Sequence, residues 1–223
     1  MGRRTAGSQA ERRRTPMKQA QRQERSRREI LQAAMEEFGT YNYSDVTIDN
    51  ICSRHGISKG MMYHYYSGKD DLFLLCAREI FQALKEHMDA LPFPAPGQTG
   101  PEAIRELFRA RETYFETRPL EKHIFENVLF NTPRHLSDQL NDLRLPLREL
   151  NRQRFRQAVS RMELRAPLDG EAVSRYLECI ESLFWPLVNQ YQGGEAIGDL
   201  PSLEAISTQV LDMVLFGIVR QER

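Results

Sequence analysis

Residues 46–73 read VTIDNICSRHGISKGMMYHYYSGKDDLF, and this stretch decides the fold of the first third of the chain. Thr47 stands where an N-cap residue would open a helix, and Gly56 stands where a left-handed residue would end it. One residue later Ser58 can cap a second short helix, expected over residues 59–65. Two short helices joined by so tight a turn are a candidate helix-turn-helix.

The residues on either side of this stretch also follow helical patterns. Apolar residues recur about every four positions between residues 25 and 39, which predicts one face of a helix there. Downstream, Ser67 and Asp70 have the spacing of a reciprocal capping pair. We therefore predict a longer helix from residue 69 to about residue 84.

The second short helix carries an unusual set of side chains. Residues 63–66 are Tyr, His, Tyr and Tyr, and they follow Gly60, which lies between a lysine and two methionines. A helix that only fills a core rarely needs so many aromatic rings with polar tips, because each tip needs a partner or solvent. We therefore expect a molecule outside the fold to contact this helix.

The same stretch resembles the DNA-binding signature of the TetR/AcrR family of transcriptional regulators. The positions that match in register are Thr47, Ile51, Gly56, Ile57, Ser58, Gly60, Tyr63, Tyr66, Lys69 and Leu72. Three positions depart from the family pattern: Cys52 replaces the usual alanine, Met61 a common threonine and Tyr66 the usual phenylalanine. The resemblance implies a helix-turn-helix head followed by a helical domain that binds a small molecule and dimerises.

The resemblance also implies contacts with double-stranded DNA through the second short helix. The candidate DNA-binding residues are Thr47, Ser58, Lys59, Gly60, Met61, Tyr63, His64, Tyr65 and Lys69. Lys59, Met61 and His64 are the residues expected to reach base edges in the major groove. Gly60 has no Cβ and lets the backbone approach the duplex.

Phosphate contacts are expected from the remaining candidates. Thr47 and Lys69 lie at helix starts and resemble the family's phosphate anchors, where amide groups and positive charge meet the DNA backbone. Tyr63 and Tyr65 can donate to phosphates. The alternative for each tyrosine is core packing, and for Lys69 it is a solvated surface charge.

Charge is distributed unevenly along the chain. The 31 basic and 31 acidic residues cancel, but residues 1–28 carry ten basic residues against two glutamates, a net charge of +8. A basic segment favours a polyanionic partner, because neutralised phosphates release their counterions. The alternative for residues 1–20 is a solvated disordered tail. Met17 is a possible native start, which would leave residues 1–16 outside the native protein.

The expected architecture is all-α, with a small head joined to a larger helical bundle. Residues 1–23 are expected to form a basic flexible arm, residues 24–84 the helix-turn-helix domain with its motif at about 47–66, and residues 85–223 the ligand-binding and dimerisation domain. The stretch 91–101 is rich in proline and glycine and is a candidate linker. Further helices are predicted at residues 102–117, 120–130, 134–163, 170–191 and 202–219.

The last predicted helix suggests how the chain assembles. Residues 210–219 contain eight apolar residues in ten, so this helix must bury more than one face. Paired with the apolar stripe of the preceding helix, it suits a four-helix interface in a homodimer. The candidate interface residues are Tyr176, Ile180, Leu187, Tyr191, Val210, Val214 and Ile218. The alternative is a buried core helix in a monomer.

Aromatic residues of the C-terminal part are candidates for an effector pocket, because helix bundles often bind ligands between helices in apolar cavities. The candidates are Phe108, Tyr114, Phe115, Phe125, Phe130, Phe155, Phe184 and Trp185. The alternative for each of them is ordinary core packing.

Other function classes find little support. No catalytic constellation, metal-ligand spacing or phosphate-binding glycine loop is present, so neither an enzyme nor a cofactor is expected. Cys52, Cys76 and Cys179 are far apart and odd in number, which is typical of reduced intracellular thiols. No apolar run is long enough to span a membrane, and no apolar segment follows the basic start as in a signal peptide. We expect a cytoplasmic protein.

The expected function is that of a homodimeric repressor. It would leave an inverted-repeat operator when a small apolar or aromatic effector binds. A first alternative is a constitutive or protein-partnered DNA-binding protein of the same fold. A second is a helical interaction protein that does not bind DNA.

Overall fold

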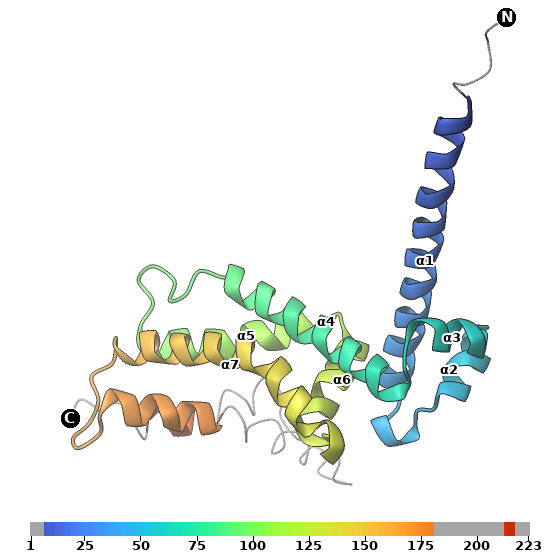
Figure 1. The fold of residues 1–223 in the computed structure, drawn as a ribbon. Coiled ribbons are helices and arrows are strands. Elements are labelled where there is room, and N and C mark those ends of the chain that lie inside the picture. Colours follow the sequence, from blue (N-terminus) through green and yellow to red (C-terminus); the bar gives the residue numbers. More distant parts are fainter. Residues whose placement is uncertain (1–6, 181–211, 217–223) are drawn as a thin grey trace, which may run out of the picture. The chain divides into compact units, whose positions relative to one another are not determined.

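The computed structural model describes residues 7–180 and 212–216, with side chains from residue 19 onward, and it confirms the all-α class (Figure 1). The elements are α1 (Gly7–Thr40), the 3-10 helix η1 (Tyr43–Asp45), α2 (Ile48–His55), α3 (Lys59–Tyr65), α4 (Lys69–Ala90), α5 (Gly100–Glu116), α6 (Pro119–Phe130), the 3-10 helix η2 (Arg134–Leu136) and α7 (Ser137–Val159). Residues 170–180 and 212–216 are also helical. The ends of the helices predicted at 170–191 and 202–219 lie outside the described residues.

The chain divides into two compact units. The first comprises Met1–Glu79 together with Pro119–Leu140, and the second comprises Ile80–Arg118 together with Asn141–Arg223. Helix α6 therefore belongs with the helix-turn-helix, and it packs against α1. The expected division at residue 84 remains a prediction, but it would separate α6 from the helix that it contacts.

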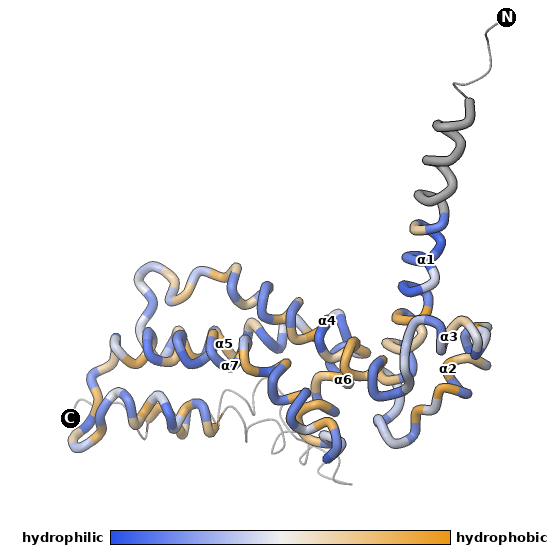
Figure 2. The backbone as a smooth tube through the Cα atoms, viewed as in Figure 1, coloured by the Kyte–Doolittle hydropathy of each residue, from blue (hydrophilic) through white to orange (hydrophobic). Residues whose placement is uncertain are grey.

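Helix α1 is longer than its apolar periodicity predicts. It begins at Gly7, so it includes much of the segment expected to be a flexible arm. Glu24 and Arg28 pair at 3.1 Å, and Arg25 and Glu29 pair at 2.8 Å, each with the i,i+4 spacing that supports a helix. The described part of α1 is hydrophilic toward its N-terminus and apolar toward its C-terminus (Figure 2). Ion pairs between polar side chains thus support α1 beyond the C-terminal part that packs against other helices.

The core of the first unit forms where α1, α2, α3 and α4 meet. Phe38 of α1 and Phe73 of α4 are almost fully buried, and their ring centroids lie 5.0 Å apart. Ile51 of α2 and Met62 of α3 have no exposed surface. Each short helix thus contributes an apolar anchor, which it needs because a helix of seven or eight residues is not stable alone.

A buried carboxylate also attaches α2 to α1. Glu37 is only 4% exposed, and it accepts from Arg54 at 2.9 Å and contacts His55 Nε2 at 3.2 Å. Arg54 and His55 lie in the last turn of α2, where positive charge also favours the helix dipole. The hydrogen bond that Arg54 donates to Glu37 raises the pKa of Arg54. These contacts fix the first helix of the motif on α1.

The capping residues predicted for the motif are confirmed. The Thr47 hydroxyl accepts from the Asn50 amide and the Ser58 hydroxyl accepts from the Met61 amide, each at 3.1 Å. Gly56 has a φ of 65°, the left-handed conformation that ends α2.

The capping pair predicted for α4 is wrong. The Gly68 carbonyl accepts from the Leu72 amide at 3.3 Å, so the helix opens one residue later than Ser67. The carboxylate that reaches back is consequently that of Asp71, which accepts from the Ser67 amide at 3.0 Å. Asp70 is thereby available for the tertiary contacts described below.

In the second unit, α5 and α7 approach each other closely at Gly100. A Cβ placed on Gly100 would lie 2.3 Å from the Ala158 carbonyl oxygen and 2.6 Å from Met162 Cγ. The start of α5 is fixed by a capping box, in which Thr99 and Glu102 bond each other's backbone amides. The helix therefore begins within the segment expected to be a linker.

Arg154 of α7 holds the end of α4. Its side chain is only 5% exposed, and its guanidinium donates to the carbonyls of Met88 and Leu91, the latter at 3.3 Å. The guanidinium also lies 4.9 Å from the centroid of the Phe93 ring. Burial lowers the pKa of Arg154. A cation is favourable here because the C-terminal end of a helix carries partial negative charge.

Candidate nucleic-acid interface

Helix α3 presents a polar face to solvent. Lys59, Gly60, Tyr63 and His64 are exposed, and Tyr63 shows 57% of its surface. Met62, on the opposite side, is fully buried. The single apolar anchor therefore orients the helix so that most of the candidate DNA-binding residues point outward.

No described part of the protein occupies the space beside Gly60. A Cβ built on this residue meets no atom within 4 Å among the described residues. The core therefore does not require a glycine there, although glycine is the poorest helix former after proline. Close approach of the α3 backbone to another molecule would explain its use.

Lys59 pairs with a carboxylate on the preceding helix. Its ammonium lies 2.7 Å from Asp49 Oδ1, and the hydrogen bond with Asp49 raises the pKa of Lys59. Both side chains are more than half exposed, so the pair is weak and can be exchanged for a contact with DNA.

The C-terminal end of α3 is attached to α1 through Arg27. The Tyr66 hydroxyl donates to the Arg27 carbonyl oxygen at 3.3 Å, and the Arg27 guanidinium lies 5.5 Å from the centroid of the Tyr65 ring. Burial raises the pKa of Tyr66. Arg27 is exposed and stands next to the candidate face. Arg27 is therefore a further candidate for phosphate contact. In the sequence, only the basic segment of residues 1–28 points to it.

The two candidate phosphate anchors differ in their surroundings. Thr47 is exposed at the start of α2. Lys69 is half-buried, donates to the Tyr43 carbonyl at 2.9 Å and places its ammonium 4.1 Å from the centroid of the Tyr43 ring. Contact between Lys69 and a phosphate therefore requires the ammonium to share or leave this position, and the role of Lys69 remains a prediction.

Tyr43, Asp70 and His135 form a cluster that we call the Tyr43 junction. The Tyr43 hydroxyl donates to Asp70 Oδ1, and His135 Nε2 lies 2.9 Å from Asp70 Oδ2 and 3.3 Å from the Tyr43 oxygen. Burial, followed by the hydrogen bond with Asp70, raises the pKa of Tyr43. The junction joins η1, the first turn of α4 and η2 around the candidate anchor Lys69.

A second close contact joins α6 to α1. A Cβ on Gly39 would lie 2.6 Å from Leu120 Cβ and 2.9 Å from Leu120 Cα. Since a backbone atom is involved, the two helices can be this close only because residue 39 has no side chain. The α6–η2 segment therefore contacts the head at both Gly39 and the Tyr43 junction.

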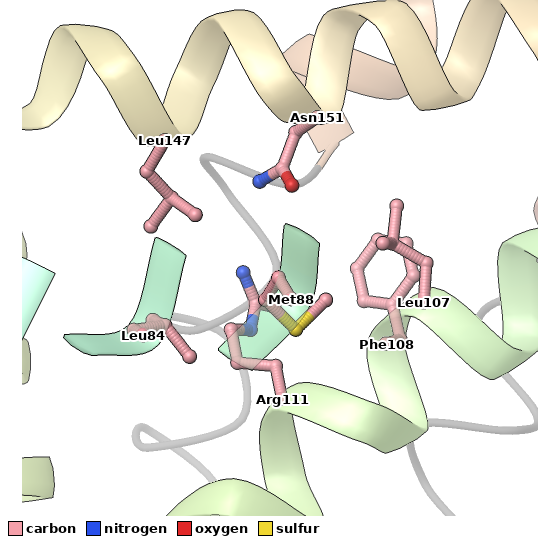
Figure 3. Close-up of a pocket in the computed structure, with 7 residues that line it drawn as sticks. All are labelled: Leu84, Met88, Leu107, Phe108, Arg111, Leu147 and Asn151. Carbon is pink, nitrogen blue, oxygen red and sulfur yellow. The ribbon is translucent and has the colours of Figure 1, made fainter. Parts of the chain in front are cut away.

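A small cavity lies in the second unit between α4, α5 and α7 (Figure 3). The residues that line it are Leu84, Met88, Leu107, Phe108, Arg111, Leu147 and Asn151. Its volume of about 10 Å³ suits a single water-sized occupant.

The structure does not bring the aromatic candidates for effector binding together. Phe108 lines the cavity, and the centroid of the Phe155 ring lies 6.4 Å from the centroid of the Phe108 ring. Tyr114 and Phe115 are buried elsewhere in the second unit, whereas Phe125 and Phe130 belong to the first unit. Phe184 and Trp185 lie outside the described residues. Arg111 and Asn151 were not singled out in the sequence, where a lone arginine or asparagine on a helix carries no signal.

Of the candidate interface residues, Tyr176, Ile180 and Val214 are described. Tyr176 is 55% exposed, and the helix of residues 212–216 also exposes Met213 and Phe216 at 72% and 59%. Leu187, Tyr191, Val210 and Ile218 lie outside the described residues. Exposed apolar side chains of this size are compatible with the predicted interface, which remains a prediction.

Within 7–180 and 212–216, no group of three or more His, Cys, Asp or Glu side chains is placed to hold a metal ion. In the same part of the chain, no helix is both long and apolar enough to cross a membrane.

Comparison with known proteins identifies the family. Residues 30–76 match the family described as bacterial regulatory proteins, tetR family. Over 64 residues the chain is 34% identical to the HTH-type transcriptional regulator BetI of Brucella anthropi, a match that covers 29% of this chain and 33% of BetI. A match of 28% identity over 171 residues, covering 77% of this chain and 85% of the relative, links it to the HTH-type transcriptional repressor AcnR of Corynebacterium jeikeium.

The fold is similar to that of a solved structure. A TetR family transcriptional regulator from Chloroflexus aurantiacus is similar over 89% of this chain and 95% of its own, with a TM-score of 0.63 and 18% identity. The match to BetI spans only about a third of that protein, and it falls on the part of this chain that holds the helix-turn-helix. The helix-turn-helix part of the chain therefore belongs to the TetR family of bacterial regulatory proteins, and a solved TetR family regulator shares the helical fold of the chain.

Proposed function

We propose that the protein is a homodimeric transcriptional repressor that binds an inverted-repeat operator and releases it when a small molecule binds the second unit. The observation that carries the proposal is the exposed face of α3, with Lys59, Gly60, Tyr63 and His64 directed to solvent above the buried Met62. It is a binding protein rather than an enzyme in this proposal, which agrees with the names of its relatives.

The inverted repeat follows from symmetry. Two α3 helices of a dimer with a two-fold axis would enter successive major grooves on one side of the duplex, roughly 34 to 36 Å apart. A change of a few ångströms in that spacing would prevent both helices from docking together. An effector therefore needs only to favour one spacing over the other, and coupling of about 1–3 kcal/mol lowers operator affinity some 5- to 150-fold.

Two routes could carry the effector's influence to the head. Helix α4 starts at Lys69 in the first unit and continues into the second, where Leu84 and Met88 line the cavity. The α6–η2 segment follows α5 in the chain and contacts the head at Gly39 and at the Tyr43 junction. Movement of either segment would alter the position of the first turn of α4 and thus of Lys69.

A second candidate function is a DNA-binding protein of the same fold without a small-molecule effector. The size of the cavity between the described parts of α4, α5 and α7 favours it, because about 10 Å³ holds no effector unless the lining side chains move. A thermal-shift screen separates the two candidates, since a ligand that binds the folded state raises the melting temperature.

The deciding experiment is to map the sites that the protein binds in its source genome and to measure the affinity of one such duplex at several salt concentrations. A regulator of the proposed kind selects inverted repeats, and log Kd depends linearly on log salt concentration. Binding that is absent at low salt would instead leave the helical interaction protein as the remaining alternative.

Loss of a phosphate contact should weaken binding to all sequences alike. Tyr63→Phe and Lys69→Ala are each expected to reduce affinity for operator and for unrelated DNA by similar factors, and Lys69→Ala should lower the salt slope by about one. Fluorescence anisotropy with both duplexes measures this. Lys85→Ala, on the same helix but in the second unit, is the control. Unchanged affinity in both variants would remove Tyr63 and Lys69 from the interface.

Removal of the basic N-terminal segment should affect affinity rather than sequence preference. Deletion of residues 1–16 removes five arginines, so binding at low salt should weaken while the ranking of operator variants stays the same. A full-length variant with Arg12, Arg13 and Arg14 changed to Gln separates charge from length. If preference at flanking A·T pairs is lost instead, the segment reads the minor groove.

A further inference from the structure

The cavity in the second unit combines apolar walls with one buried cation. Arg111 lies near the middle of α5 and is only 6% exposed, which is rare for arginine. Asn151 of α7 is equally buried. Figure 3 shows both polar ends directed into the space between α4, α5 and α7. The other residues around the space are aliphatic, thioether or aromatic.

Arg111 and Arg154 are both buried in the described part of this unit, and they lie at different places. Arg154, one helical turn beyond Asn151, donates to backbone carbonyls at the end of α4 and so has a structural role. The guanidinium of Arg111 lines the cavity and lies 5.4 Å from the centroid of the Phe108 ring, close enough for a cation–π contact. A guanidinium has five donor hydrogens, so it can bind a ligand in addition to its contacts within the protein.

We propose that this cavity is the effector site and that it selects a small monocarboxylate with an apolar body, whose carboxylate binds Arg111 and Asn151. A planar guanidinium binds a carboxylate through two parallel hydrogen bonds, and the Asn151 amide can add a third. A cationic ligand would meet a like charge. A phosphate monoester would bring nearly two negative charges to a cavity where, among the described lining residues, Arg111 is the one charged side chain.

The apolar body needs more room than the present cavity offers. Met88 is unbranched and adaptable, and Leu84 lies one turn before it on α4. A ligand that enters would displace these two side chains and therefore act on α4, the helix that begins at Lys69. The inference thus rests on the proposed function for its regulatory meaning, but the binding specificity can be tested separately.

The test uses defined probes with the full-length protein. Decanoate and 4-phenylbutyrate are compared with 1-decanol, 4-phenylbutanol, decyltrimethylammonium and decyl phosphate by calorimetry and thermal shift. At least one carboxylate should bind roughly tenfold or more tightly than its alcohol, a difference of about 1.4 kcal/mol, and than the cation and the phosphate. Equal binding of the alcohols, preference for the cation or the phosphate, or no binding of either carboxylate at millimolar concentration would overturn the proposal.

Variants locate the site. Arg111→Met keeps most of the side-chain volume and should reduce the preference for carboxylate over alcohol to less than twofold, whereas Arg111→Lys should retain part of it. If Arg111→Met does not fold, Asn151→Leu and Leu107→Trp serve instead, the first weakening carboxylate binding and the second blocking all probes. A preference unchanged in these variants would place the site elsewhere.

Operator binding is measured in the same preparations without probe. Normal operator binding without carboxylate selectivity would refute this inference and leave the DNA-binding proposal intact. Carboxylate selectivity in a protein that binds no DNA would support this inference and refute the DNA-binding proposal.

Discussion

Gly60→Leu is expected to abolish tight operator binding and to leave the free protein folded and at least as stable. No described atom lies within 4 Å of the new Cβ, and leucine is a better helix former than glycine. On DNA the side chain would hold the α3 backbone away from the duplex. Loss of one or two base contacts, each worth about 1–3 kcal/mol, corresponds to roughly 10- to 100-fold or more in Kd.

Two controls sharpen this experiment. Ala83→Leu adds the same side chain to an exposed position of α4 in the second unit, and it should change neither operator affinity nor stability. Gly60→Ala should give an intermediate loss of affinity. Operator affinity that is unchanged in Gly60→Leu would show that the α3 backbone does not approach DNA, and the major-groove assignment of α3 would then have to be abandoned.

Gly100→Val is expected to have the largest effect on stability. Its Cβ would lie 2.3 Å from the Ala158 carbonyl oxygen, which belongs to the backbone and cannot rotate away as a side chain can. Helices α5 and α7 would have to separate, and overpacking of this kind costs about 3 kcal/mol. For a chain of this length the melting temperature should fall by roughly 6 to 12 °C.

The matched control for Gly100→Val is Gly170→Ala. Its Cβ would lie 3.4 Å from Val159 Cγ1, which is close to ordinary contact, so the melting temperature should hardly change. Calorimetric scans of both variants test the contact. If Gly100→Val has the same melting temperature as the wild type, α5 and α7 are not held at the distance seen here.

The helix-turn-helix could be predicted in detail because its determinants are local. Thr47, Gly56 and Ser58 act on residues within one turn of themselves, so their roles follow from spacing alone. The pair expected at Ser67 failed by one position, because α4 opens one residue later and Asp71 bonds the Ser67 amide, which leaves Asp70 to contact Tyr43 and His135. Spacing alone cannot reveal a tertiary contact whose partner lies 65 positions further along the chain.

The candidate site in the second unit shows the opposite case. Phe108 could be proposed as a lining residue from its type, but Arg111 and Asn151 acquire their meaning only when α5 and α7 are placed side by side. The close contacts at Gly39 and Gly100 are equally non-local, since each depends on the residue that faces a glycine from another helix. Periodicity identifies helices and their apolar faces, but it does not say which helices meet.

The division of the first unit between Met1–Glu79 and Pro119–Leu140 has a consequence for synthesis. The ribosome adds about 5–20 residues per second, so several seconds separate the emergence of α4 from that of α6. During this interval the side of α1 that α6 will cover remains open to water or to chaperones. The nascent head can complete its packing only after α5, a helix of the other unit, has been made.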